Sequence, residues 1–190
     1  MQPRRALRRA IDHRESVKIA HMGRQRSAIY GFPLAVGQQL VLVHAVPEFD
    51  PDGFHVLPID QITHVRSGDC ERFLERVLRD EHRLREVWPA RGQPLYAELP
   101  LENWRTLFEA LGALGELVIV ECEGRRVKQD FFLGPVIAVA RDAVGMRDIS
   151  PTAKLDPAPS VVPFASITRV HFAERYTRVF SRYADESPDS

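Results

Sequence analysis

The sequence predicts a mainly β protein with flanking helices, of the α+β class, built twice from one small unit. The first observation is an echo, because residues 56–65 (VLPIDQITHV) return in the second half as residues 161–170 (VVPFASITRV). The second is a central break, since residues 89–94 (PARGQP) combine prolines with a glycine. The third is that the same order of helical and strand patterns surrounds both copies of this repeated segment. We therefore expect two domains, at residues 1–90 and 95–190.

The first domain begins with a helix and two strands. Residues 3–12 carry apolar side chains on one face and arginines on the other, which is typical of an amphipathic helix. Residues 17–21 alternate apolar and polar positions like a half-buried strand. Residues 27–36 form a second strand, in which Gly31 and Pro33 indicate a bend or bulge.

The rest of the first domain contains three more strands and a closing helix. Residues 40–43 are apolar on both faces, as in a strand covered on both sides. The echo reads as two short strands around a one-turn break at Pro58. From Asp69, a plausible N-cap, the pattern becomes helical. We expect this helix to bury Phe73, Val77 and Leu78, and Phe73→Ala to cost on the order of 3 kcal/mol.

The second half repeats this order. The matched patterns are a helix at residues 101–111, strands at 117–122, 131–134 and 144–149, the echo, and a closing helix at 176–183. The offset between the halves grows only within loops, where insertions are tolerated. We expect Val179 and Tyr183 to be the buried residues of the closing helix in this half. The alternative is an α+β domain with two coincidentally similar hairpins.

A helix followed by about five short strands, the second bent at a glycine, resembles the Sm-like small β-barrel. The one-turn break before the last strand also resembles SH3-like barrels. The resemblance covers nearly the whole chain twice, but it concerns element order, and the motifs of the Sm RNA pocket are missing. The resemblance implies a tandem duplication of a small Sm-like/SH3-like barrel, each followed by an amphipathic helix. That helix departs from the family pattern and puts ring assembly in doubt.

The charge and cysteine content exclude several function classes. The formal net charge is +0, so no overall field favours nucleic acid or an anionic membrane. Cys70 and Cys122 lie far apart and outside any CxxC spacing, and we expect both to be reduced and partly buried. Neither a secretory signal nor an apolar run of membrane-spanning length is present in the sequence. We therefore expect a cytoplasmic protein without a membrane partner.

Histidines are the first candidates for chemistry. None of the 7 histidines stands in a motif with metal-ligand spacing. His44, His55 and His64 are the set that can converge, at one end of the first domain, although we expect solvent-facing positions for them. Turn chemistry explains the carboxylates of residues 50–53. No nucleophile or nucleotide motif is present. We therefore expect no catalytic residue, no metal site and no cofactor.

The most basic segment is the candidate binding surface. It contains, on or just after the first helix, Arg4, Arg5, Arg8, Arg9, Arg24 and Arg26. An arginine-bearing helix can contact phosphates or an acidic partner, although a solvated helix face explains the same pattern. Lysine is rare in the chain, which fits a GC-rich genome and weakens the argument from arginine counts.

Three functional hypotheses follow. The leading one is a non-catalytic interaction or assembly module, bacterial and cytoplasmic, that binds an unknown protein partner or self-associates. The alternative is a nucleic-acid-binding protein that contacts RNA through its basic first helix and barrel surface. An enzyme using His44, His55 and His64 ranks last, and fold-level analogy is a weak warrant for all three.

Overall fold

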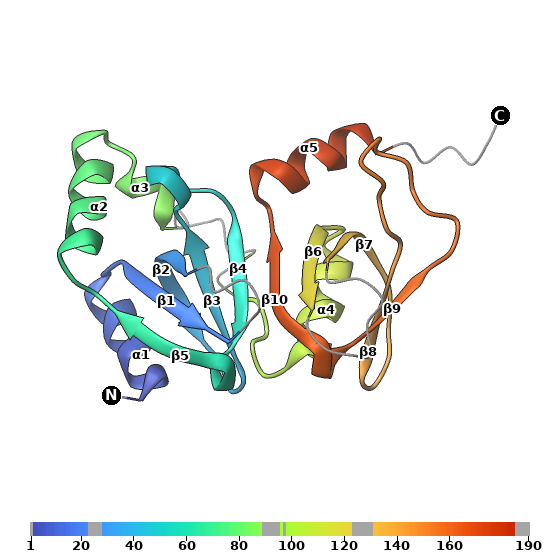
Figure 1. Cartoon of the computed structure of the whole chain (residues 1–190), viewed down its shortest axis with the longest axis horizontal. Coiled ribbons are helices and arrows are strands. Elements are labelled where there is room, and N and C mark those ends of the chain that lie inside the picture. The colour runs from blue at the N-terminus through green and yellow to red at the C-terminus, as the bar shows by residue number, and fades with distance from the viewer. Residues whose placement is uncertain (1, 23–27, 89–95, 97, 123–130, 185–190) are drawn as a thin grey trace. The chain divides into compact units, whose positions relative to one another are not determined.

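The chain forms two compact units, Met1–Glu102 and Asn103–Ser190, called here the N-terminal and C-terminal units. The structure is a computed structural model that describes residues 2–22, 28–88, 96, 98–122 and 131–184. Both units consist mainly of antiparallel strands with flanking helices (Figure 1), which confirms the predicted α+β class. The predicted boundary between residues 90 and 95 lies outside the described residues.

The N-terminal unit contains one antiparallel sheet. Its elements are α1 (Pro3–His13), β1 (Val17–His21), β2 (Ile29–Val36), β3 (Leu40–Ala45), β4 (Phe54–Pro58), β5 (Ile62–Arg66), α2 (Asp69–Asp80) and α3 (Leu84–Val87). Within the unit, the strand order is β5-β1-β2-β3-β4. The predicted one-turn break is confirmed, because a 3-10 turn, Ile59–Gln61, joins β4 to β5.

The C-terminal unit has the corresponding order. Its elements are α4 (Trp104–Ala113), β6 (Leu117–Cys122), β7 (Phe131–Val139), β8 (Ala143–Met146), β9 (Ser160–Pro163), β10 (Ile167–Phe172) and α5 (Arg175–Tyr183). Its strand order is β10-β6-β7-β8-β9, and a 3-10 turn, Phe164–Ser166, precedes β10. Among the described strands, neither unit's row closes on itself, so the predicted barrels are not confirmed.

A glycine in the second strand of each unit lets two backbones approach closely. A Cβ atom at Gly31 would collide with the carbonyl oxygen of His44, and one at Gly134 would collide with that of Arg147. Further along, the register of β2 shifts between Pro33 and Ala35, and β7 has a corresponding shift. The bend predicted for residues 27–36 is therefore confirmed, and it takes the form of a β-bulge.

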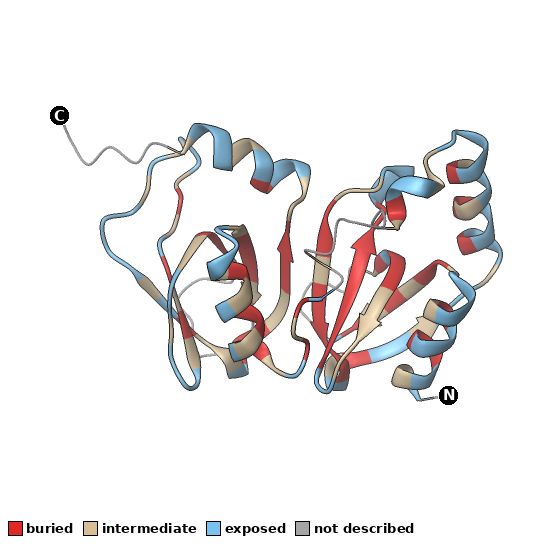
Figure 2. Cartoon of the chain, turned by 180° about the vertical axis from the view of Figure 1, so that it is seen from behind, coloured by how far each residue is buried: buried red, intermediate tan, exposed pale blue. Residues whose placement is uncertain are grey.

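The two faces of the N-terminal sheet are covered by different helices. On one face, Leu7 and Ala10 of α1 pack on a core that includes Val41 and Val43. On the other face, α2 and α3 pack over Phe32. Every residue of β3 is consequently buried, as expected for a strand covered on both sides (Figure 2).

The closing helices bury only part of the predicted stripe, because Leu78 is buried as predicted and Phe73 is not. Leu74 and Leu78 of α2 are buried, whereas Phe73 is 46% exposed. The N-cap is Gly68, not Asp69, and its N–H donates to Oε2 of the fully buried Glu71 at 2.7 Å. This cap turns the 71–74–78 face inward and leaves Phe73 about 100° away on the helix surface. The predicted burial of Phe73 is therefore wrong, and the cost of Phe73→Ala, which assumed that burial, stays a prediction.

The other burial predictions are confirmed only in part. Tyr183 is 70% exposed, so its predicted burial is wrong, and Val77 and Val179 are only half-buried. Cys122 is buried but Cys70 is exposed, and both are free thiols. These helices lie on the outer faces of their sheets, where one narrow stripe suffices for contact.

We expect Gly31→Ala and Gly134→Ala to cost roughly 2–4 kcal/mol each, because the added methyl group meets a backbone carbonyl that cannot move independently of its strand. Chemical denaturation of each variant measures the cost. Gly112→Ala is the matched control, since it lies in α4, where a Cβ meets its nearest side-chain atom at 3.4 Å. Its effect should be neutral or stabilising by up to about 1 kcal/mol. Equal costs at all three glycines would contradict the close approach.

Candidate functional site

The C-terminal unit has an open pocket of about 530 Å³ between α5, β7 and the loop after β8. Its apolar lining comprises Phe131, Leu133, Ile149, Leu155, Tyr176 and Phe180. Phe131 is 46% exposed and Tyr176 is 50% exposed. Exposed rings beside a buried apolar floor are typical of a ligand or partner site rather than of a core.

The loop that forms one wall is held by its own hydrogen bonds. The N–H of Ser150 donates to the carbonyl oxygen of Lys154 at 2.8 Å, and the N–H of Lys154 donates to Oγ of Ser150 at 3.1 Å. At its base, the N–H of Asp156 donates to the carbonyl oxygen of Asp148 at 2.7 Å. Ser160 Oγ donates to Oδ2 of Asp148 at 2.6 Å. These hydrogen bonds hold the loop that forms this wall in one conformation.

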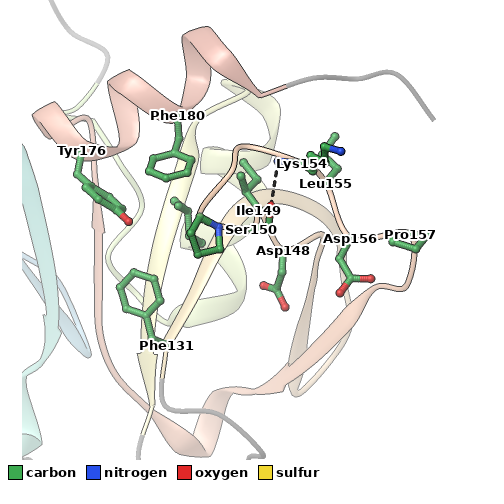
Figure 3. A pocket seen from close by; sticks show the side chains of 12 residues that line it. Phe131, Asp148, Ile149, Ser150, Lys154, Leu155, Asp156, Pro157, Tyr176 and Phe180 are labelled. Carbon is green, nitrogen blue, oxygen red and sulfur yellow. Dashed lines mark hydrogen bonds between the residues drawn. The ribbon is translucent and has the colours of Figure 1, made fainter. Parts of the chain in front are cut away.

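Helix α5 supplies the opposite wall. Tyr176 and Phe180 are four residues apart, so both rings lie on one helix face, with centroids 4.8 Å apart. Thr177, between them in sequence, is buried and donates from Oγ1 to the carbonyl oxygen of Glu174 at 3.1 Å. Figure 3 shows the rings of Phe131, Tyr176 and Phe180 on one side of the pocket and the carboxylates of Asp148 and Asp156 on the other.

The polar side chains that the structure describes in the pocket are two carboxylates, one ammonium group and two hydroxyls. Asp148, Asp156 and Lys154 together carry one net negative charge. The described lining has two hydroxyl groups, those of Ser150 and Tyr176. Oγ of Ser150 lies 3.0 Å from Oγ1 of Thr152. Among the described lining residues no histidine or cysteine is present. A nucleophile paired with a base, which covalent catalysis needs, is therefore not assembled there.

A buried ion network lies elsewhere in the C-terminal unit, on β6, β10 and the start of α5. Arg169 binds Glu121 through both its Nε, at 3.0 Å from Oε2, and its Nη2. The ring of His171 lies between two carboxylates, with Nε2 3.3 Å from Oε1 of Glu121 and Nδ1 3.0 Å from Oε1 of Glu174. His171 is 8% exposed. A charged imidazole is therefore paired on both sides.

The network sets its own charges. Burial by itself would raise the pKa of Glu121, but hydrogen bonds from His171 and Arg169 outweigh it and lower that pKa to about 2. Burial would likewise lower the pKa of His171, but its bonds to Glu121 and Glu174 raise it above 6.5. The raised pKa favours the protonated form of His171, which the two carboxylates pair. The geometry is that of a structural ion network.

This network predicts two pH-dependent losses of stability. His171 contributes fully below pH 6.5, and that contribution disappears as the pH rises through its raised pKa in the folded state. Glu121 contributes fully above pH 4.5, and that contribution disappears as the pH falls towards about 2. Urea unfolding of the wild type across the pH range from about 2 to 9 should show both losses.

His171→Gln should flatten the loss at higher pH and leave the acid limb in place. His64→Gln is the control, because His64 is exposed on β5. A wild-type free energy of unfolding that is constant from neutral to mildly alkaline pH would contradict the raised pKa of His171.

The arginines of the predicted basic surface have different environments in the structure. Arg4 is a structural residue, since its guanidinium donates to the carbonyl oxygens of Gly37 and Gln38 at 2.6 Å each. Arg5 and Arg8 are exposed on α1. Arg9 is also exposed and lies 3.6 Å from Glu15. Arg24 and Arg26 lie outside the described residues.

The three candidate histidines do not share one face. On the paired strands β3 and β4, His44 is opposite Phe54 and His55 is opposite Val43, so their side chains point to opposite faces of the sheet. His64 lies on β5, separated from β3 by β1 and β2. His44 is also buried, against expectation, and its Nδ1 lies 2.7 Å from the carbonyl oxygen of Val87.

Sequence reasoning missed the pocket. Phe131 was assigned to a strand, and Tyr176 and Phe180 to a closing helix, without regard to their exposure. The available signal was a difference between the halves, because the proline-rich loop at residues 147–159 is longer than its counterpart before β4.

Comparison with known proteins finds no matching family model, no matching curated protein and no matching solved structure. Within the described part of the chain, the helices are too short or too polar to cross a bilayer. Inference about function therefore depends on the residues themselves.

Proposed function

We propose that the chain is a duplicated small-barrel protein that serves as a non-catalytic interaction module. The supporting features recur in both units: the strand order, the 3-10 turn before the last strand, the helix after it, and the close approach at Gly31 and Gly134. The free state of Cys70 and Cys122 is compatible with the reducing cytoplasm in which we place the protein.

The pocket under α5 is the proposed binding site. The observation that carries this proposal is an open pocket whose rings of Phe131 and Tyr176 are about half exposed. Apolar lining with a few fixed polar groups is the usual composition of a binding site. Its partner is a protein, because an apolar surface of this kind favours aromatic or aliphatic anchors over phosphates.

Indole, as an isolated aromatic anchor, tests the pocket directly. We expect titration of ¹⁵N-labelled protein to shift the amide signals of Ser150, Lys154 and Leu155, which line the pocket. Tyr176→Ala should weaken indole binding several-fold. Tyr183→Ala is the matched control, since Tyr183 is an exposed tyrosine of the same helix outside the pocket. Amide shifts scattered over both units would contradict indole binding in the pocket. Equal indole affinities of Tyr176→Ala and Tyr183→Ala would contradict it as well.

A second candidate is RNA binding through α1, favoured by the exposure of Arg5, Arg8 and Arg9 on one helix. A variant with Arg5, Arg8 and Arg9 all changed to Ala should bind single-stranded RNA more weakly. The slope of log K against log salt concentration should become shallower by about 2. The control is the triple Ala variant of Arg72, Arg76 and Arg79, which removes the same charge from exposed positions of α2. Equal losses in the two variants, or no binding at low salt, would eliminate this candidate.

A further inference from the structure

We propose that the pocket under α5 receives a short segment of a partner protein, consisting of a basic residue followed by aliphatic and aromatic anchors. This inference rests on the proposed duplication and on the pocket as the binding site. It follows from a comparison with the N-terminal unit, in which the chain itself supplies such a segment at the corresponding place.

In the N-terminal unit, residues 84–88 fill the space between the closing helix and the sheet. Val87 is 0% exposed and clusters with Phe32, Val46, Leu74 and Leu78, while Leu84 and Trp88 pack against the same cluster. The Trp88 ring meets Phe32 edge-on at 5.7 Å. The cluster is therefore completed by three apolar anchors, Leu84, Val87 and Trp88, from the chain that follows α2.

Backbone hydrogen bonds identify the equivalent floor in the C-terminal unit. The N–H of Val46 donates to the carbonyl oxygen of Tyr30 at 2.8 Å, and the N–H of Ile149 donates to that of Leu133 at 2.7 Å. Because Tyr30 and Leu133 each precede the close-approach glycine, Ile149 corresponds to Val46.

The helices correspond in the same way. Leu74 follows its N-cap, Gly68, by six residues, and Phe180 follows its N-cap, Glu174, by six. The third residue after each cap, Glu71 or Thr177, is buried. Phe180 thus takes the place of Leu74.

Ile149, the counterpart of Val46, belongs to a buried cluster against which Phe180, the counterpart of Leu74, packs, and both residues also line the pocket. Ala184, the described residue that follows α5, packs against this cluster with a methyl group alone. In the described part of the C-terminal unit, the floor and the helix of this arrangement are therefore present, and the chain after α5 places no bulky apolar side chain like those of Val87 and Trp88 there.

Charge specifies the start of the segment. In the N-terminal unit, Nη2 of Arg83, the residue before α3, binds Oδ1 of Asp50. Asp50 lies in the sequence Phe-Asp-Pro, which Leu-Asp-Pro at residues 155–157 matches. By backbone hydrogen bonds Asp156 corresponds to Asp52, because their N–H groups donate to the equivalent carbonyl oxygens of Asp148 and Ala45. Asp156 therefore places an exposed carboxylate in the pocket on the loop that carries Asp50 in the N-terminal unit. A partner arginine paired with Asp156 would reproduce this ion pair, with Phe131 and Tyr176 receiving the aromatic anchor.

The test uses a fluorescein-labelled peptide of residues 82–88 (HRLREVW), added to the whole protein and followed by anisotropy. Its copy within the N-terminal unit stays in place because it is held intramolecularly. We expect saturable binding, weakened about tenfold by Tyr176→Ala and several-fold by Asp156→Asn. Tyr183→Ala should bind like the wild type. A peptide in which Val87→Ser and Trp88→Ser remove two of the three anchors should bind at least tenfold more weakly.

The outcomes separate this inference from the proposed function. Indole binding in the pocket without peptide binding would overturn the inference alone, and the absence of both would overturn the binding site too. Peptide binding that is insensitive to Tyr176→Ala and Asp156→Asn would place the peptide elsewhere and overturn the inference. Self-association that Tyr176→Ala abolishes, together with no peptide binding, would identify a second copy of this chain as the occupant instead.

Discussion

The close approach of two backbones at a glycine is the constraint on which each unit depends. Because Gly31 and Gly134 lack a Cβ, the second strand of each unit can lie against a carbonyl of the third. The register shift further along then bends the strand, so that it pairs with the first strand along one half and the third along the other. The closing helix lies over the outer face of this bent sheet.

The outer face is where the two units differ. In the N-terminal unit, α3 and Trp88 complete an apolar cluster beneath α2, and Nδ1 of His44 lies against the carbonyl oxygen of Val87. In the C-terminal unit, Phe180 and Ile149 occupy matching positions at the edge of an open pocket. Among the described residues, bulky side chains after α2 fill this space in the N-terminal unit, and Ala184 alone follows α5 in the C-terminal unit. We propose that this difference makes the pocket a binding site for apolar anchors.

The predictability of these features follows the range of the interactions that produce them. The echo at residues 56–65 and 161–170 predicted a 3-10 turn and the following strand, because proline and alternating apolar residues act locally. Phe73 was misplaced because a backbone cap by Glu71 rotates the buried stripe, and periodicity alone cannot choose between adjacent stripes. The role of Arg4 depends on a turn 33 residues away. The pocket and the Glu121–His171 network join residues that lie far apart in sequence. Local sequence patterns therefore did not predict either of them.

The most direct measurement is a search for intermolecular NOEs between the HRLREVW peptide and methyl-labelled protein. The account predicts NOEs from the peptide tryptophan ring to the methyl groups of Ile149 and Leu155, which line the pocket beside α5. A saturated complex whose NOEs reach other methyl groups and neither of these would contradict it.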